Sequence, residues 1–214
     1  MSLMMTPEQL KVYYQQLYKQ HGDTPASVQH VSRSAQNVRF KIFHEFIDNQ
    51  SSVLDLGCGL ADFLVYLRQN NHQGHYLGCD FVTEFISRNN QVFMEDELSK
   101  FYELNLLEAD FPQGYDVVAM SGIFNNVLTC NEVFLMKTLE KAFAVANHTV
   151  IFNALSSYVE YQDDTLFYVD PIKLFHHVKS HLTPFVQLKH DYVTKPDGFP
   201  YEFTMVLKKV GDLP

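Results

Sequence analysis

Two carboxylates and two glycines are the residues whose types and spacing point to chemistry. Asp55 ends an apolar run, Gly57 and Gly59 follow it, and Asp80 ends the next apolar run. Glycine lacks a Cβ, so this turn can bend sharply and let a ligand approach the backbone closely. Asp80 lies at roughly the interval after the glycines at which doubly wound folds place an acid on a ribose hydroxyl. The pattern therefore predicts a site for a nucleoside-containing cofactor.

Two such cofactors compete for the glycine turn. The dinucleotide fingerprint requires a third glycine at position 62, where this chain has Asp62, whose charge would repel a pyrophosphate. An NAD-dependent oxidoreductase is therefore the less favoured alternative. The run VLDLGCGLADF has the form D-x-G-x-G-x-A, with Ala61 as the third small residue. It resembles motif I of the class I S-adenosylmethionine-dependent methyltransferases, and this resemblance implies S-adenosylmethionine as the cofactor.

Other side chains follow the expected strands at their carboxyl ends, where open α/β sheets bind ligands. Phe81 can lie against the adenine face. In the family that the chain resembles, an acid often stands at the position of Asn105 and binds the adenine amino group, while a neighbouring backbone N–H reads a ring nitrogen. Arg39 can pair with the methionine carboxylate. The predicted cofactor-binding residues are Arg39, Asp55, Gly57, Cys58, Gly59, Asp80, Phe81, Asn105, Leu106, Ser121 and Gly122.

The methyl acceptor is expected near the later strand ends. Asn125 belongs to the SGIFNN segment after the fourth strand, and the 155–169 segment is rich in aromatic residues, with Tyr158 and Tyr168 as candidate pocket walls. Long loops in compact domains tend to be functional. His190 and Asp191 are the candidates for a general base, with a structural hydrogen bond as their other interpretation.

These side chains need a frame of alternating strands and helices. Apolar runs predict strands at 52–56, 75–79, 101–104, 115–120, 149–154, 185–192 and 201–208. Helical patterns predict helices at 7–21, 35–48, 60–70, 83–88, 131–146 and 171–181. The expected fold is α/β: a Rossmann-like, seven-stranded, mostly parallel sheet with a C-terminal antiparallel hairpin and helices on both faces. Residues 1–50 are expected to form N-terminal helices that cap the site, and residues 51–214 the methyltransferase core of one domain.

Composition excludes several other classes. A formal net charge of -9 disfavours a nucleic-acid partner. Three cysteines without C-x-x-C spacing indicate neither a disulfide framework nor a zinc site, and His177 and His181, at i and i+4, have no evident third ligand. We therefore predict no metal. The absence of an 18-residue apolar run and of a secretory signal predicts a cytoplasmic protein with no membrane partner, as a monomer or homodimer.

The resemblance extends from about Tyr13 to Lys208. The stretches SGIFN, FNALS, FYVDP, HDY and YEFT, with HGDTP and Gln36 to Phe40, resemble a bacterial group of uncharacterised small-molecule methyltransferases. The function this implies is methyl transfer from S-adenosylmethionine to an oxygen or nitrogen nucleophile of a small molecule, which leaves S-adenosylhomocysteine. A catalytically silent cofactor-binding or interaction module with the same fold is the other alternative.

Overall fold

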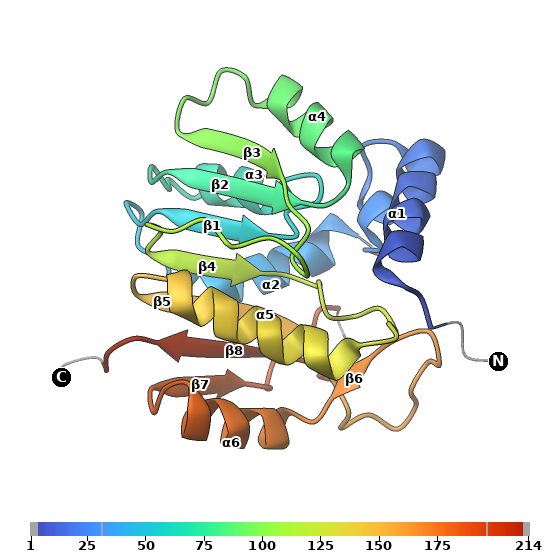
Figure 1. The fold of residues 1–214 in the computed structure, drawn as a ribbon, viewed down its shortest axis with the longest axis vertical. Helices are drawn as coiled ribbons and strands as arrows, with labels where there is room; N and C mark the ends of the chain where they lie inside the picture. Colours follow the sequence, from blue (N-terminus) through green and yellow to red (C-terminus); the bar gives the residue numbers. More distant parts are fainter. Residues whose placement is uncertain (1–3, 31, 196, 212–214) are drawn as a thin grey trace.

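One twisted sheet runs through the molecule, with helices on both faces (Figure 1). The computed structural model describes residues 4–30, 32–195 and 197–211. The strand order is β3-β2-β1-β4-β5-β8-β7, with the short β6 paired to β5 off this path. The chain thus starts in the middle of the sheet, moves to one edge and returns to build the other half. This reversal beside β1 and β4 creates the crevice in which doubly wound sheets bind ligands.

The first five strands are parallel to one another, and of the last two main strands only β8 runs in the opposite direction. β8 pairs antiparallel with β5 on one side and with β7 on the other, so the predicted C-terminal hairpin is confirmed. The strands are β1 (Val53–Leu56), β2 (Tyr76–Asp80), β3 (Ser99–Glu103), β4 (Val117–Met120), β5 (Thr149–Ser156), β6 (Tyr168–Val169), β7 (Val186–Lys189) and β8 (Glu202–Lys208).

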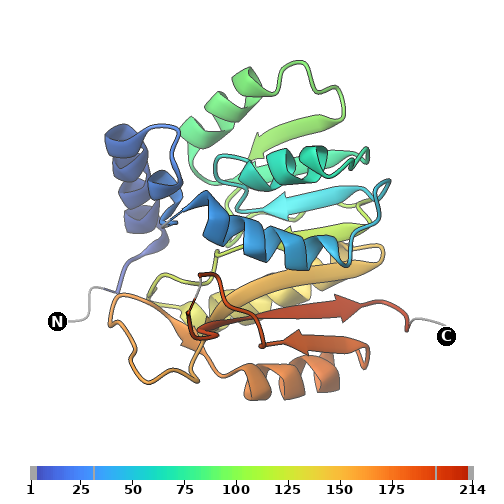
Figure 2. The ribbon, with the colours of Figure 1, turned by 180° about the vertical axis from the view of Figure 1, so that it is seen from behind.

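Helices cover both faces of the sheet. Figure 1 shows α5 and α6 on the near face, and Figure 2 shows α2 and α3 on the opposite face. α1 stands apart from both layers, beside the carboxyl ends of β1, β2 and β4. The helices are α1 (Pro7–His21), the 3-10 turn η1 (Pro25–Val28), α2 (Arg33–His44), α3 (Asp62–Gln69), α4 (Thr83–Val92), α5 (Asn131–Val145) and α6 (Pro171–His181).

Local sequence explains where several helices begin. The Thr6 hydroxyl accepts from the Gln9 amide, and the Gln9 side chain accepts from the Thr6 amide, which is a capping box. The Asp170 carboxylate accepts from the amides of Ile172 and Lys173 at the start of α6. These caps satisfy amides that have no partner inside the helix.

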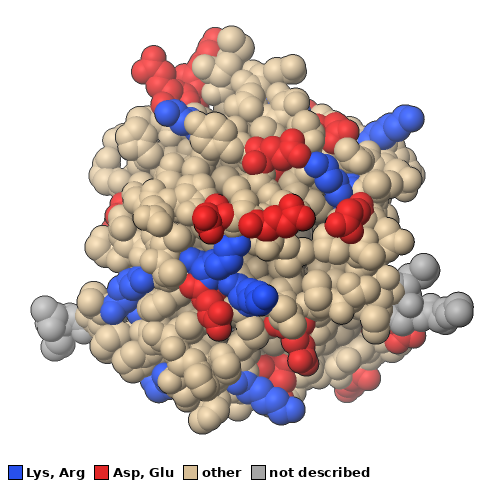
Figure 3. All heavy atoms as spheres, in the orientation of Figure 1, with Lys and Arg blue, Asp and Glu red and all other residues tan. Residues whose placement is uncertain are grey.

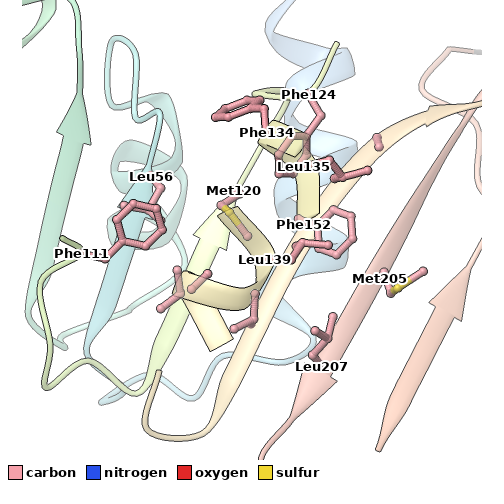
Figure 4. Close-up of a cluster of buried hydrophobic side chains, with 14 of the residues drawn as sticks. Leu56, Phe111, Met120, Phe124, Phe134, Leu135, Leu139, Phe152, Met205 and Leu207 are labelled. Atoms are coloured by element: carbon pink, nitrogen blue, oxygen red, sulfur yellow. The ribbon is translucent and has the colours of Figure 1, made fainter. Parts of the chain in front are cut away.

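The core beneath α5 fixes the middle of the sheet. Figure 4 shows side chains of this helix packed against β4, β5 and β8. Leu139, Met120, Phe152 and Met205 are fully buried there. All eight residues of β5 are buried, as expected for a strand covered on both faces. The crevice residues are therefore carried by strands that cannot shift without opening the core.

The sequence predicted the main elements and missed two short ones. The seven main strands and six α-helices fall at or within a few residues of the expected ranges. The sequence did not predict η1, nor β6, an eighth strand of two residues. Pro196, in the predicted turn between β7 and β8, lies outside the described residues. No helix in the described part of the chain is long and apolar enough to cross a membrane.

Candidate functional site

The turn after β1 is shaped by its glycines. Gly57 and Gly59 have φ angles of 79° and 51°, in the region that favours glycine. A Cβ on Gly57 would overlap the side chain of Ile123, so this position has no room for one. The amides of Gly57 and Cys58 both donate to the Cys79 carbonyl, at 2.7 and 3.0 Å. The turn is therefore tied to the neighbouring strand β2.

Asp80 ends β2 and holds the same turn from the other side. Its carboxylate accepts from the amides of Gly59 and Val82, each at 2.9 Å. The side chain is buried, and burial raises the pKa of Asp80 to about 6. Asp55 is also buried and accepts from the Tyr76 hydroxyl, and burial raises the pKa of Asp55 to about 7. Two carboxylates are thus concentrated at one edge of the sheet.

A cavity of about 600 Å³ opens beside these groups. Its size suits a nucleotide-sized organic ligand. All eleven predicted cofactor-binding residues line it, and so does Asn125. Phe81 faces it beside Tyr14, whose ring lies 6.3 Å away edge-on. The Asn105 carboxamide also lines it, although its Oδ1 accepts from the Leu107 amide at 3.1 Å. The structure therefore brings the predicted cofactor-binding residues together around one cavity, and their binding role stays a prediction.

The N-terminal helices contribute a large part of the cavity wall. Residues from α1, η1 and α2 line it. Asn126, in the segment after β4, donates to the Tyr14 hydroxyl at 2.9 Å and to Gln29 Oε1 at 3.0 Å. Tyr14 in turn donates to Gln29 Oε1 at 2.7 Å, and burial raises the pKa of this tyrosine. This three-residue network ties α1 and the segment after η1 to the sheet.

Buried polar atoms without partners gather around the segment after β4. The Gly122 amide donates to Asn153 Oδ1 at 2.9 Å, which leaves Asn153 Nδ2 without a partner. Ser121 Oγ, Asn125 Oδ1 and Gln36 Oε1, all from cavity-lining residues, are also buried and unpartnered in the described structure. Such groups are uncommon in native proteins because each costs about 1–3 kcal/mol. Their concentration here indicates the place of a polar ligand.

Arg39 lines the cavity, but its charge already has a partner. Its Nε lies 2.8 and 2.9 Å from the two carboxylate oxygens of Glu202, and its Nη2 lies 2.7 Å from Oε2. Both side chains are buried. The remaining guanidinium nitrogen, Nη1, contacts His30 Nδ1 at 2.7 Å. The predicted pairing of Arg39 with a methionine carboxylate would therefore compete with this buried ion pair.

The predicted base and two predicted substrate residues lie elsewhere. The ring of His190 packs near Tyr158 and Phe203, each with its centroid 6.3 Å away, and its Nε2 lies 3.2 Å from the Pro200 carbonyl. Asp191 is exposed. Neither residue lines the cavity. Their role as a general base therefore stays a prediction, and the residues of the β7–β8 segment that line the cavity are Thr194 and Lys195.

Tyr158 and Tyr168 also do not line the cavity. Tyr158 is 51% exposed, and the Tyr168 hydroxyl accepts from the Asp163 amide within its own loop. The loop reaches the cavity through apolar residues instead: Leu155 and Leu166 line it, and the amide of Phe167 donates to the Asn125 carbonyl. The loop is therefore near the site, although its tyrosines are not in the wall.

Cys58 and the pair His177 and His181 show no arrangement for catalysis or metal binding in the described structure. Cys58 is buried, and burial raises the pKa of its thiol, which disfavours the nucleophilic thiolate. His177 and His181 stack on each other on α6, with ring centroids 4.2 Å apart. Among the described residues, no group of three or more potential ligands could hold a metal ion.

The comparisons with known proteins agree with this geometry. Residues 54–148 match the model of a family described as a methyltransferase domain, and these residues run from β1 to just before β5. This stretch is therefore similar to a methyltransferase domain, in agreement with the class I S-adenosylmethionine-dependent methyltransferases that the sequence resembles. No curated protein sequence matches significantly. The comparisons bear on this class, and membership of the narrower bacterial group stays a prediction.

Solved structures show the same fold at low sequence identity. Magnesium protoporphyrin IX methyltransferase from Synechocystis PCC 6803, with bound S-adenosylhomocysteine, has a TM-score of 0.65 at 12% identity, covering 92% of this chain and 93% of that one. The DhpI–S-adenosylhomocysteine complex has a TM-score of 0.62 at 12% identity, with the same coverage. Haemonchus contortus phosphoethanolamine N-methyltransferase 1 has a TM-score of 0.66 at 12% identity, covering 98% of this chain and 51% of that one.

Several residues of the methyltransferase site were not predicted as such. Tyr14 carried a signal as part of the aromatic stripe of the first helix, which suits packing or a lid. Glu202 and Gln36 lie in stretches that carry the family resemblance. Asn153 also lies in such a stretch, FNALS, although its contact with Gly122 was not predicted. His30 was not predicted as a site residue, because its importance depends on a contact with Arg39 that the sequence does not reveal.

Proposed function

We propose that this methyltransferase transfers the methyl group of S-adenosylmethionine to a small-molecule acceptor, and that both bind in the cavity at the carboxyl edge of the sheet. The observation that carries the proposal is the continuity of that cavity. It runs from the glycine turn and Asp80 to Asn125 and to the N-terminal helices. Cofactor and acceptor can therefore meet inside one enclosed space.

The adenosine half of the cofactor is assigned to the β2 and β3 ends. Asp80 accepts from the ribose hydroxyls, since an ionised carboxylate has about four acceptor sites and the amides of Gly59 and Val82 do not fill them. Phe81 packs against the adenine ring. Asn105 and the backbone at Leu106 contact the adenine edge. These roles are supported by the positions of the four residues in the cavity wall.

The methionine half is assigned to the glycine turn and the start of the segment after β4. Gly57, Cys58 and Gly59 allow close approach of the ligand, and Asp55 lies beneath them at the end of the strand. Ser121 and Gly122 face the same space. Unpartnered Ser121 Oγ supports this assignment because a polar ligand would supply the missing hydrogen bond.

The acceptor half is assigned to the space beside Asn125. Leu155 and Leu166 supply an apolar wall there, and Asn125 Oδ1 supplies an unpartnered acceptor. The transfer is an in-line displacement in which the nucleophile bonds to the methyl carbon while the carbon–sulfur bond breaks. The electron pair of that bond goes to sulfur. Because the sulfonium is already activated, the main contribution of the chain is to align the reactants and exclude water.

The proposal also assigns residues 1–50 the role of a cap over the cavity. The hydrogen bonds of Asn126 to Tyr14 and Gln29 support such a cap, because they connect it to the sheet. A cytoplasmic location and a monomeric or homodimeric state stay predictions from the sequence.

Isothermal titration tests the cofactor part of the proposal. S-adenosylhomocysteine should bind with micromolar or tighter affinity, whereas NADH should not bind. Asp62 begins α3 beside the glycine turn, where its charge disfavours a pyrophosphate. NADH binding without S-adenosylhomocysteine binding would overturn the proposal and restore the oxidoreductase alternative.

A further inference from the structure

The imidazole of His30 lies between a buried ion pair and the cavity. Arg39 Nη1 contacts His30 Nδ1 at 2.7 Å, while Glu202 binds two other nitrogens of the same guanidinium. His30 itself lines the cavity. The three residues form a chain from β8, through α2, to the cavity wall.

The chemistry of arginine decides the state of this histidine. A guanidinium has only donors and keeps its proton in proteins, so it must donate to Nδ1. Nδ1 is then an acceptor without a proton, and the proton of the neutral ring is on Nε2. Burial and the charge of Arg39 lower the pKa of His30 to about 3, which agrees with a neutral ring. His30 therefore has no free lone pair and cannot act as a general base.

The free edge of the ring lies beside the segment after β4. A Cβ placed on Gly122 would lie 3.8 Å from His30 Cε1, 4.0 Å from its Nε2 and 3.6 Å from Asn125 Nδ2. Next to Gly122, Ser121 Oγ is buried without a partner in the described structure. The Nε2–H group thus faces a polar part of the cavity that is not satisfied by the protein itself.

We infer that His30 is a hydrogen-bond donor of fixed tautomer that binds a carboxylate oxygen of a ligand beside Gly122, with Arg39 and Glu202 as positioning residues. A carboxylate fits because two further donors lie on this side of the cavity: Asn125 Nδ2, 3.6 Å from a Cβ placed on Gly122, and the unpartnered Ser121 hydroxyl. Lys195, which also lines the cavity, is a cation. The inference rests on the proposed function and names the ligand group that the cavity binds beside His30 and Gly122. The carboxylate belongs either to the amino-acid tail of the cofactor or to the methyl acceptor.

Nitrogen NMR on the intact protein tests the tautomer directly and does not depend on methyl transfer. In ¹⁵N-histidine-labelled protein, the His30 signals are those lost in His30→Gln. They should show a protonated Nε2 and an unprotonated Nδ1 between pH 6 and 8. The opposite tautomer, or an imidazolium at pH 7, would overturn the inference even if S-adenosylhomocysteine binds. In Arg39→Met/Glu202→Leu, which removes both charges, the two tautomers should be mixed; an unchanged tautomer would remove Arg39 and Glu202 from the positioning role.

Three probes separate the two sources of the carboxylate. If the cofactor supplies the carboxylate, the Nε2–H resonance of His30 should move when S-adenosylhomocysteine is added. It should not move with 5′-methylthioadenosine, because that compound lacks the amino-acid tail. If the acceptor supplies it, the resonance should move only when benzoate is added to the S-adenosylhomocysteine complex. A resonance that moves with 5′-methylthioadenosine, or with none of the three probes, contradicts carboxylate recognition.

Matched variants give the size of the effect. His30→Gln can keep an N–H group near the position of Nε2, whereas His30→Leu cannot. His30→Leu should weaken the binding of the responsive probe about ten- to a hundredfold, as expected for a hydrogen bond to a charged group, and His30→Gln should retain most of the affinity. Equal losses in both variants would indicate a packing role and overturn the donor role. Folding of each variant is checked by its ¹⁵N spectrum.

Discussion

At the scale of single residues, the proposed binding of the cofactor ribose depends on Asp80. Its carboxylate is held by the amides of Gly59 and Val82, and it is the acid placed to accept from ribose hydroxyls. Asp80→Ala should weaken S-adenosylhomocysteine binding by about 1–3 kcal/mol, measured by isothermal titration. Asp191→Ala is the control, because this exposed acid does not line the cavity. Unchanged affinity in Asp80→Ala would remove the residue from the site.

Asp80 also predicts a pH dependence. Because burial raises the pKa of Asp80 to about 6, part of the ligand-free protein is protonated there at mildly acidic pH. Only the ionised form can accept from both hydroxyls, so affinity for S-adenosylhomocysteine should rise between pH 5 and pH 7 and then level off. Asp80→Asn should flatten this rise. An affinity that falls over this range in the wild-type protein would contradict the assignment.

At the scale of elements, the Arg39–Glu202 pair connects α2 to β8. Removing one partner leaves an uncompensated buried charge, so Arg39→Met should lower the free energy of unfolding by about 3–5 kcal/mol. Arg39→Met/Glu202→Leu should recover much of this loss, because replacing both charges by apolar side chains is often tolerated. Urea unfolding measures both. A double variant as unstable as the single one would show that the loss comes from packing and not from charge.

The cap over the cavity gives a second prediction at this scale. Tyr14→Phe removes the hydroxyl that joins α1 to Asn126 and Gln29, at a cost of about 1 kcal/mol. Amide hydrogen exchange in α1 and η1 should become faster, while exchange in β5 stays unchanged. Tyr13→Phe is the matched control, because its hydroxyl accepts from Gln29 Nε2 at the longer distance of 3.2 Å and, among the described residues, makes no hydrogen bond to Asn126. Equal acceleration in the two variants would contradict a specific role for Tyr14.

The sequence could predict the parts of this site that depend on residues close together in the chain, but not those that depend on distant partners. The glycine turn and Asp80 are local signals within one strand–turn–helix–strand stretch, so the sequence was sufficient. Arg39 finds Glu202 163 positions away, and no local pattern reveals such a partner. His190 follows a strand end at the correct edge, but the sequence did not show that Thr194 and Lys195, a few residues later, would line the cavity in its place.

At the scale of the whole molecule, charge and architecture agree with a small acceptor. Acidic and basic side chains are interspersed on the face seen in Figure 3, and the formal net charge is -9. A negative chain is a poor match for a phosphate backbone. The proposed acceptor site lies inside a cavity that the N-terminal elements partly enclose. An enclosed site favours a metabolite that can enter over a folded macromolecule.

Whether the protein methylates a small molecule can be measured by incubating it with methyl-tritiated S-adenosylmethionine and a cell extract. The account predicts enzyme-dependent tritium in the small-molecule fraction, separated from unreacted donor, and its loss in Asp80→Ala at limiting donor concentration. Tritium in the protein or nucleic-acid fraction alone would contradict a small-molecule acceptor. No transfer to any fraction, by a protein that binds S-adenosylhomocysteine, would contradict methyl transfer and favour a silent cofactor-binding module.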